Sequence, residues 1–467
     1  MSFLWTVALC AIALAVVEIS KWLYRWSNPK CNGKLPPGSM GFPIVGETIE
    51  FFKLHGCYEI LPFVKKRMSR YGPLFRTNLF GSNTVVLTEP DVIFEVFRKE
   101  NKSFMFSYPS AIVKPFGKDN MCLEHGGIHK QLKQITLQLL GSKGLKRNMI
   151  RDMDRATRDH LRSKASQGSF DAEDAVKSLL LAHLTPKMMS NLKPETQRNL
   201  LDQINAFNID WFQSPLRLTT WKSLYRAYIA RREAMKVIND AFTRRKASRE
   251  KCGDFLDTLV EELEKGSVIS DEGFYISLIF GLLIVYKDST SVAICLAIKF
   301  ISENPKALAE LKREHEAILQ NREDKESGVT WEEYRHKMIF TNMLRFMENI
   351  WQQHAGYTIP AGWIVAVVPS VVHFDPTIYE NPLEFNPWRW EGKELRSASK
   401  TFMVFGAGAR QCAGADSARL QMSIFIHHLV TKYDFSLAQE LELVRSPYPH
   451  FPKGLPINIS ESPKSLV

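Results

Sequence analysis

The sequence lacks the cysteine pattern of a disulfide framework or a zinc site. Its 467 residues contain seven cysteines, which are scattered without a CxxC pair or a regular spacing. Free thiols of this kind are typical of proteins in a reducing compartment. The sequence also has no internal repeat and no low-complexity linker, so its hydrophobic residues, 45% of the total, are available to build a sizeable globular core.

The features of a nucleic-acid-binding protein are missing as well. Lys and Arg outnumber Asp and Glu by 61 to 50, a formal charge of +11. No basic run is interleaved with aromatic residues, however, and no nucleic-acid-binding module is recognisable. The positive balance therefore favours an acidic partner or an anionic membrane surface, and we expect no nucleic acid partner.

Charged side chains are absent from residues 1–17. The first cations after this apolar run are Lys21, Arg25, Lys30 and Lys34. A membrane helix needs roughly 17–25 residues, so the pattern predicts a single-pass anchor at residues 1–24. Because the cations follow the apolar run, the rest of the chain is expected in the cytosol. A cleaved signal peptide is the alternative, since Ala13–Ala15 would suit a peptidase.

The segment after the anchor changes in composition. Residues 25–47 are basic and then rich in proline and glycine, which predicts a hinge between anchor and globule. We expect residues 48–467 to form a single domain, mainly α with small β-sheets. Strands are predicted within Thr77–Pro90, and two further short strands within Gly356–Lys393.

The longest predicted helix spans residues 270–305 and is apolar on nearly every face. A second membrane span is rejected, because its uncharged run has only about fourteen residues and Lys287 and Asp288 would lie near the bilayer centre. Beside a cavity, the cluster Asp288, Ser289 and Thr290 is suited to deliver protons. The alternative is a buried polar notch whose hydrogen bonds are all satisfied.

Small residues surround one cysteine in the stretch FGAGARQCAG, residues 405–414. The sequence from Gly414 onward predicts a helix, so Cys412 lies just before a helix amino terminus, where a thiolate is stabilised. The small side chains let a large flat group approach the backbone, and Arg410 is placed to pair with a carboxylate of that group. Haem meets these requirements. A small buried apolar residue is the alternative for a lone cysteine.

Five residues of this stretch match the signature F-x-x-G-x-R-x-C-x-G, namely Phe405, Gly408, Arg410, Cys412 and Gly414. The sequence thereby resembles the cytochrome P450 family along nearly its whole length. It is similar to plant members of the clan that oxidises brassinosteroids and triterpenoids, and most of all to the thalianol hydroxylase group. The resemblance implies the P450 fold, with haem b (heme b, iron protoporphyrin IX) between the long central helix and the helix after the cysteine loop.

The resemblance also assigns roles to individual residues. Cys412 would be the axial ligand of the haem iron, and Phe405 would shield its sulfur. His129 and Lys133, in the stretch GGIHKQLK, would face the haem propionates. Arg389, in FNPWRW, would tie its irregular segment to the family's K helix.

The function implied by the resemblance is that of a monooxygenase. It would hydroxylate a bulky apolar polycyclic substrate, a triterpenoid or sterol-like compound, with O2 and electrons from NADPH. NADPH-cytochrome P450 reductase would deliver the electrons, and its acidic docking face suits the basic balance of this chain. The protein would sit in the endoplasmic reticulum membrane with its catalytic domain in the cytosol.

The chain departs from the family pattern at the K helix, which carries Glu-x-x-Arg in relatives. Arg345 stands at the arginine, but Asn342 occupies the glutamate position, and only ten residues separate Arg345 from Gly356. Arg389 would then lack its family partner, so we expect weaker haem retention.

In the central helix, Tyr286 would fill space needed by oxygen or substrate if its side chain faced the haem. Two alternative functions remain at this point. One is a non-catalytic product that folds or binds haem poorly, and the other is a haem-thiolate isomerase or dehydratase that needs no oxygen.

Overall fold

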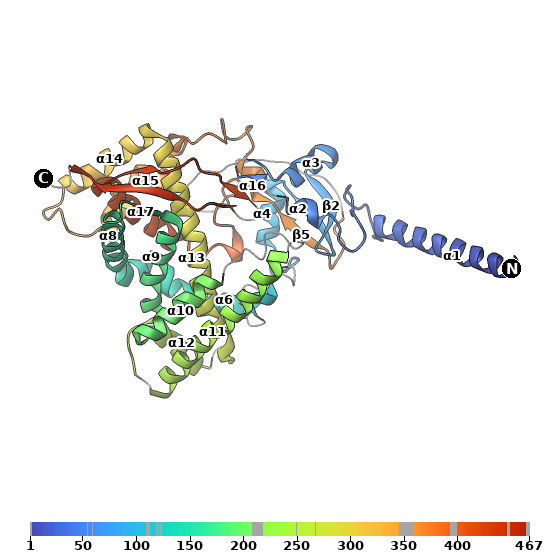
Figure 1. Ribbon diagram of the computed structural model, residues 1–467, viewed down its shortest axis with the longest axis horizontal. Coiled ribbons are helices and arrows are strands. Elements are labelled where there is room, and N and C mark those ends of the chain that lie inside the picture. Colours follow the sequence, from blue (N-terminus) through green and yellow to red (C-terminus); the bar gives the residue numbers. More distant parts are fainter. Residues whose placement is uncertain are drawn as a thin grey trace. The chain divides into compact units, whose positions relative to one another are not determined.

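The computed structural model describes residues 2–53, 55–57, 59–108, 113–117, 120, 124–207, 218–248, 250–266, 268–344, 358–392, 399–445 and 449–463. The chain divides into two compact units. Unit 1 is built from residues 1–96, 348–383 and 399–403, and unit 2 from residues 97–347, 384–398 and 404–467. Both are traced in Figure 1, where helices dominate and the sheets are small. The predicted fold class, mainly α with small β-sheets, is confirmed.

Unit 1 begins with the apolar helix α1 (Ser2–Ser27). Its stretch Trp5–Ser27 is long and apolar enough to cross a membrane, and none of it is buried within the protein. The end of the helix is tied to the segment that follows, because the Trp26 indole N–H donates to the Gly41 carbonyl at 3.1 Å. These features are consistent with the predicted membrane anchor.

The globular part of unit 1 is a three-stranded sheet. Strand β2 (Leu74–Leu79) pairs antiparallel with β3 (Ser82–Leu87), and β3 pairs in parallel with β5 (Ile364–Val367). The other elements of this unit are α2 (Thr48–Phe51), β1 (His55–Gly56), α3 (Pro62–Tyr71), α4 (Pro90–Arg98, its end reaching into unit 2) and α16 (Pro369–His373). Phe63, Val64, Phe75, Leu79 and Val86 form its buried core.

The prediction of two strands within Gly356–Lys393 is wrong for the described residues 358–392, which contain one strand, β5. Pro369 ends the extended stretch, since it has no N–H for a ladder, and it starts the short helix α16 instead. The strands predicted within Thr77–Pro90 are confirmed as parts of β2 and β3.

Unit 2 contains most of the helices. They are α6 (Gly126–Leu140), α7 (Ser142–Gly144), α8 (Ile150–Ala165), α9 (Ala172–Met188), α10 (Pro194–Ala206), α11 (Leu218–Ser248), α12 (Phe255–Glu264), α13 (Glu272–Glu303), α14 (Pro305–Gln320), α15 (Ile339–Leu344) and α17 (Ala415–Lys432). Short helical turns are η1 (Lys114–Phe116), η2 (Leu145–Met149), η4 (Glu333–Lys337), η5 (Pro387–Trp390) and η6 (Gly408–Arg410). Its strands are β4 (Ser169–Asp171), β6 (Tyr433–Leu437), β7 (Val444–Arg445), β8 (Pro449–His450) and β9 (Pro456–Glu461).

Helix α13 is the central helix of unit 2. The Asp271 side chain caps its start by accepting from the Gly273 N–H at 2.8 Å, and Pro305 begins the next helix directly after it. It packs against α9, α10, α11, α14 and α17 (Figure 1). Two thirds of its most apolar window is buried inside the protein. The expectation of a buried core helix rather than a second membrane span is therefore supported.

Helix α17 begins directly after the cysteine loop. It packs on α8, α13 and α14, and its last residue leads into β6. Strand β9 lies between β4 and β6 and pairs antiparallel with both, while β7 and β8 form an antiparallel pair. The loop that carries Cys412 is thus attached to one of the most buried helices of unit 2.

Candidate haem site

The cysteine loop is held by its own backbone. The Cys412 N–H donates to the Phe405 carbonyl at 2.9 Å, which closes the loop around the turn η6. Gly406 and Gly408 have positive φ angles of 70° and 63°, a region that favours glycine. A Cβ atom at Gly408 would lie 2.4 Å from the Phe97 carbonyl oxygen. Glycine is therefore required at Gly408 by backbone conformation and by close approach of another chain segment.

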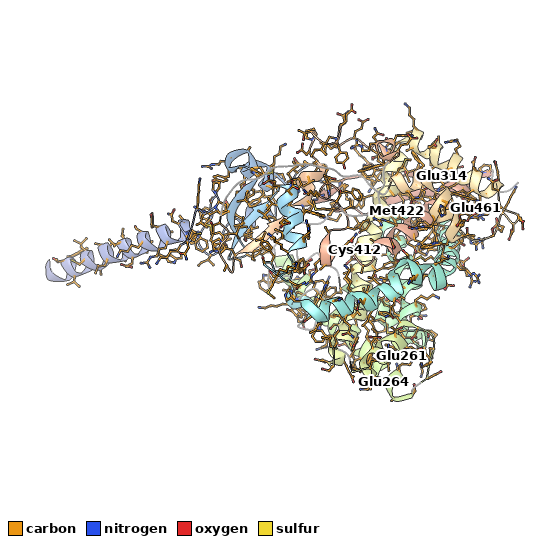
Figure 2. All side chains as sticks on the ribbon, turned by 180° about the vertical axis from the view of Figure 1, so that it is seen from behind. Glu261, Glu264, Glu314, Cys412, Met422 and Glu461 are labelled. Carbon is orange, nitrogen blue, oxygen red and sulfur yellow. The ribbon has the colours of Figure 1, made fainter. Side chains whose placement is uncertain are left out.

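The Cys412 side chain is exposed, and Figure 2 shows it at the entry to α17, with Met422 further along the same helix. The backbone N–H groups of Gly414 and Ala415 point towards its sulfur and lower the pKa of the thiol, as do the charges of Arg419 and Lys133. Although the side chain is accessible to solvent, the protein atoms packed around the sulfur disfavour its charged form more than these effects favour it, so the pKa of the thiol is raised overall. A cation bound at the sulfur would shift this balance towards the thiolate.

Arg410 is embedded among the protein's own groups. Its guanidinium donates to Glu100 at 2.5 Å and to the Glu124 carbonyl at 2.6 Å, and it lies 3.3 Å from His125 Nδ1. The ring of Phe106 lies beneath it, with its centroid 4.6 Å away. The sequence predicted a carboxylate partner on a bound group. In the structure, Glu100 is the carboxylate partner of Arg410. Because a guanidinium group has five N–H donors, Arg410 is able to bind a further acceptor as well.

Helix α6 brings His129 and Lys133 to the same loop. The Lys133 ammonium donates to the Ala409 carbonyl at 2.7 Å, and burial lowers its pKa. His129 is buried, and burial together with the nearby Arg410 charge lowers its pKa to about 4. At neutral pH, His129 is therefore uncharged and retains an N–H donor. The structure brings together three of the predicted cofactor-binding residues around the cysteine loop.

The middle of α13 exposes one stripe of side chains. Val285 is 54% exposed, Ser289 is exposed and Asp288 is half-buried; residues at i, i+3 and i+4 share a helix face. Tyr286 and Thr290 are buried away from this stripe. Burial raises the pKa of the Tyr286 phenol, and Ser417 of α17 lowers it in part. Tyr286 thus packs into the protein interior and does not lie on the exposed stripe.

The polar residues on α13 differ in their surroundings. The Ser289 hydroxyl donates back to the Val285 carbonyl at 2.6 Å, a contact that loosens the regular helix ladder. The Asp288 carboxylate lies 3.2 Å from the buried ammonium of Lys287. Sequence reasoning missed Lys287 and Glu100 as members of the site. A lysine within an otherwise apolar helix was the available signal for Lys287, but nothing local marked Glu100.

The described part of the K region is the short helix α15. Arg345 and Gly356, named in the sequence argument, lie outside the described residues. Glu314 of α14 binds the start of α15, accepting from the Thr341 hydroxyl at 2.6 Å and its N–H at 3.1 Å. Burial raises the pKa of Glu314. The Arg389 guanidinium donates to the Glu384 carbonyl at 3.1 Å.

These residues fit a haem group. Within the described residues, no cluster of three or more His, Cys, Asp or Glu side chains is suited to hold a metal ion, so these residues do not supply a metal at Cys412 with a full set of ligands. Such a metal must bring its remaining ligands with it, as the iron of haem does. The accessible thiol, the glycines of its loop and the neighbouring His129, Lys133 and Arg410 all suit a flat anionic macrocycle.

Comparisons with known proteins agree with this site. The chain is 69% identical over 476 aligned positions to Cytochrome P450 708A2 of Arabidopsis thaliana, which covers 99% of this chain and 100% of the relative. It is 32% identical to Beta-amyrin 16-alpha-hydroxylase CYP87D16 of Maesa lanceolata, over 99% and 100% of the two chains.

Among solved structures, retinoic acid bound cyanobacterial CYP120A1 superposes with a TM-score of 0.78 at 21% identity, over 92% of this chain and 100% of that one. That similarity shows the fold. The sequence profile described as Cytochrome P450 matches residues 36–451. The chain therefore belongs to the cytochrome P450 family of haem monooxygenases.

Proposed function

We propose that this protein hydroxylates a bulky apolar polycyclic substrate, a triterpenoid or sterol-like compound, with Cys412 as the axial ligand of haem b. The observation that carries the proposal is the exposed Cys412 thiol, held in a glycine-bearing loop with two backbone N–H groups directed at its sulfur. The substrate class is supported by the relative from Maesa lanceolata, whose name describes the hydroxylation of beta-amyrin.

Residues around the loop would hold the cofactor. Lys133, His129 and Arg410 supply a cationic and hydrogen-bonding side suited to the propionates. Gly414 leaves space beside the sulfur, since a Cβ there would lie 3.9 Å from Cys412 Sγ, whereas Gly408 lets the loop approach the Phe97 backbone. Phe405 lies beside the sulfur loop, with the Arg419 guanidinium 4.5 Å from its ring centroid. Haem with an axial thiolate supplies the oxygen activation that hydroxylation requires.

On the central helix, Asp288 and Ser289 would move protons. Both lie on the stripe of α13 that the fold leaves open, and a carboxylate next to a hydroxyl can pass a proton between them. Thr290, the third residue predicted for this role, is buried off the stripe. It would support the helix around the pair, whereas Val285 would border the reacting substrate.

Electron supply and location complete the proposal. Electrons from NADPH would arrive through NADPH-cytochrome P450 reductase, and the net charge of +11 favours an acidic partner. Helix α1 would anchor the protein in the endoplasmic reticulum membrane by a single span, with the catalytic domain in the cytosol.

The reduced carbon monoxide difference spectrum tests the ligand. We expect Cys412→Ser to abolish the thiolate-type Soret band, because a serine hydroxyl has too high a pKa to provide the same donating ligand. Cys252→Ser, at a partly buried cysteine of the described chain, is the matched control and should keep the band. A normal thiolate band in Cys412→Ser would overturn the assignment.

Turnover assays separate the proposal from a haem-thiolate isomerase or dehydratase. Product formation should require both oxygen and NADPH, and the oxygen atom of the product should come from O2. Turnover in the absence of oxygen would refute a monooxygenase.

A further inference from the structure

A buried lysine lies directly beside the candidate proton-delivery residues. Lys287, on α13, is only 2% exposed and is flanked by the buried residue Tyr286. Burial of an ammonium group without a partner costs several kcal/mol, and such a lysine tends to lose its proton. Its persistence in the middle of an apolar helix therefore requires acceptors, and the structure provides two of different kinds.

The first acceptor is the neighbouring carboxylate. The Lys287 ammonium lies 3.2 Å from Asp288 Oδ1, and the two side chains are 3% and 23% exposed. At these exposures the pair is only weakly screened by solvent, so the attraction between the ammonium and the carboxylate is stronger than that of a surface pair. The lysine thus acts on the acid that shares the exposed stripe with Ser289.

The second acceptor belongs to another helix. The Lys287 ammonium donates to the Ile204 carbonyl at 3.1 Å. Ile204 lies in the last turn of α10, which ends at Ala206, and carbonyls of a last turn have no partner within their own helix. A cation at this end is also favoured by the helix dipole. Lys287 therefore caps α10 from the neighbouring helix.

The end of α10 is fixed by aromatic packing as well. Phe207, the residue after α10, is fully buried, and its ring contacts Phe116 and Phe280 at centroid distances of 5.2 Å and 5.1 Å. Phe280 lies on α13, two turns before Lys287. The lysine is thus the polar part of a junction whose apolar part is this aromatic cluster.

Helix α9 contributes further charge to the surroundings of Asp288. Burial lowers the pKa of Lys177, but Glu173 at 2.6 Å, together with Asp288 and Asp174, raises it overall. The charged groups around Asp288 therefore include the ammonium groups of Lys287 and Lys177, and Lys177 is shared with Glu173 and Asp174. From α10, the contact to Lys287 is the Ile204 carbonyl.

We propose that Lys287 is a positioning residue that holds the Asp288 carboxylate in place and fastens the carboxyl end of α10 to α13. The part of this proposal that concerns proton delivery rests on the proposed function; the clamp between the two helices does not. Through this one side chain, the placement of α10 and the charge state of the acid are coupled.

Replacement of Lys287 by methionine tests the clamp. The matched control is Lys299→Met, on the same helix about twelve residues away, or roughly 18 Å. Lys299 is also buried, 7% exposed, and is paired with Glu303 at 2.6 Å. Both variants lose a buried lysine from α13, so both should be less resistant to urea.

Hydrogen exchange of the full-length protein then distinguishes the two sites. In Lys287→Met, the amides in the last turn of α10, up to Phe207, should exchange about tenfold faster, because a charge-assisted hydrogen bond to that turn is lost. In Lys299→Met they should exchange as in the wild type. Equal exchange at the end of α10 in both variants would overturn the clamp.

The pH profile of product formation tests the effect on the acid. Removal of a neighbouring cation raises the pKa of a carboxyl group, so the acid limb of the profile in Lys287→Met should move to higher pH by about one unit or more. Lys299→Met should not move it. An unchanged limb in Lys287→Met would overturn the electrostatic part of the proposal.

Two further variants keep the test decisive. If Lys287→Met is too unstable to assay, Lys287→Met/Asp288→Asn removes both charges and should recover part of the urea resistance, since no half-buried carboxylate is then left without its cation. Failure to recover would contradict the pairing. Asp288→Asn alone should lose the acid limb of the pH profile. If this variant keeps the acid limb, proton delivery by Asp288, which belongs to the proposed function, is refuted. The hydrogen-exchange result would still decide whether Lys287 clamps α10 to α13.

Discussion

Two arginine-bearing segments of unit 2 are held in different ways. In the cysteine loop, Arg410 pairs with Glu100, 310 residues away in the sequence, and the two side chains are 10% and 7% exposed. In the turn η5, Arg389 donates to the carbonyl of Glu384, five residues away in its own segment. The long-range pair of Arg410 fixes the loop to another part of the fold, whereas the hydrogen bond from Arg389 to Glu384 joins residues of a single turn.

The cysteine loop and the K region of this chain differ in how closely they follow the sequence pattern of the family. Around the cysteine loop, the signature residues are all present and their contacts are made. At the K region the signature glutamate is missing, and α15 is held instead by Glu314 and by a hydrophobic cluster that Phe340 shares with α14 and α17, including Leu311 and Ile426. In the described residues, hydrogen bonds from Thr341 to Glu314 and apolar packing around Phe340 thus hold α15 in place.

The largest effect should come from restoring that network. We expect a family-like K helix with Glu-x-x-Arg and the strands after it, inserted between Met343 and Gly356, to raise haem content per protein several-fold. The reason is that the inserted glutamate would complete the charge network that the family resemblance assigns to Arg389, and guanidinium cannot reduce its charge by deprotonation. Haem content is measured by the pyridine haemochrome assay together with the carbon monoxide spectrum.

The control for the insertion separates charge from length. The same insertion with its glutamate changed to alanine restores chain length and strand pairing but not the network, so it should recover much less haem. Full recovery with alanine would mean that backbone structure alone was missing. Equal haem content in the original chain and in the glutamate insertion would show that the short K region is tolerated.

Much of the local structure around the cysteine loop could be predicted from the sequence, because it depends on residues that are close together in the chain. The signature spacing located Cys412, and the apolar run between a capping Asp271 and Pro305 located α13. The loop's glycines were also visible as candidates for close approach. What is local in sequence, namely turns, caps and helix periodicity, was predicted correctly here.

The partners across the fold were not readable. Nothing near Arg410 indicates that Glu100 meets it, and nothing near Lys287 indicates the Ile204 carbonyl, because these contacts depend on how distant helices pack. The surroundings of the Cys412 thiol depend on packing for a related reason: the helix terminus is local, but the protein atoms that raise the pKa of the thiol come from several segments. The second strand predicted near Pro369 is not found, and this could have been expected from the sequence, because proline has no N–H to continue the hydrogen bonds between strands.

The next effect concerns the long-range pair of the cysteine loop. Glu100→Gln should lower the free energy of unfolding by about 3 kcal/mol, because it leaves the Arg410 guanidinium buried without its counter-charge. Asp434→Asn is the control: it breaks the exposed pair of Asp434 with Lys312 at 3.0 Å and should cost less than about 1 kcal/mol. Urea unfolding measures both. Equal losses would mean that the Arg410 pair is no stronger than a surface pair.

A smaller effect is expected in the K region on acidification. His315 of α14 is fully buried beside Thr341 at 2.9 Å, and burial lowers its pKa from 6.5 to about 3. Below pH 6.5 the unfolded chain takes up a proton that the folded protein does not, so stability is lost as pH falls from 6.5 towards 3. At pH 5 this amounts to about 1–2 kcal/mol.

The measurement for His315 is urea unfolding at pH 7 and pH 5. The glutamine of His315→Gln cannot titrate. The loss in free energy of unfolding between pH 7 and pH 5 should therefore be about 1–2 kcal/mol smaller in this variant than in the wild type, whatever its stability at pH 7. His336→Gln, at an exposed histidine of η4, is the matched control and should keep the wild-type dependence. An unchanged pH dependence in His315→Gln would show that His315 does not contribute to acid destabilisation.

The smallest effect on both regions should come from removing the anchor. Deletion of residues 1–34 should release the protein from membranes without unfolding it, because α1 is unburied and neither the cysteine loop nor α15 contains any of these residues. The deletion removes single contacts, such as the hydrogen bond from the Thr358 N–H to the Lys34 carbonyl at 3.0 Å, each contributing about 1 kcal/mol. Deletion of residues 1–24 alone retains that contact and should behave as wild type in urea.

Sedimentation with microsomes measures release, and protease treatment of sealed microsomes measures orientation. Protection of the carboxyl terminus from protease would contradict the cytosolic placement, and haem loss in the 1–24 deletion would show that the anchor supports the site after all.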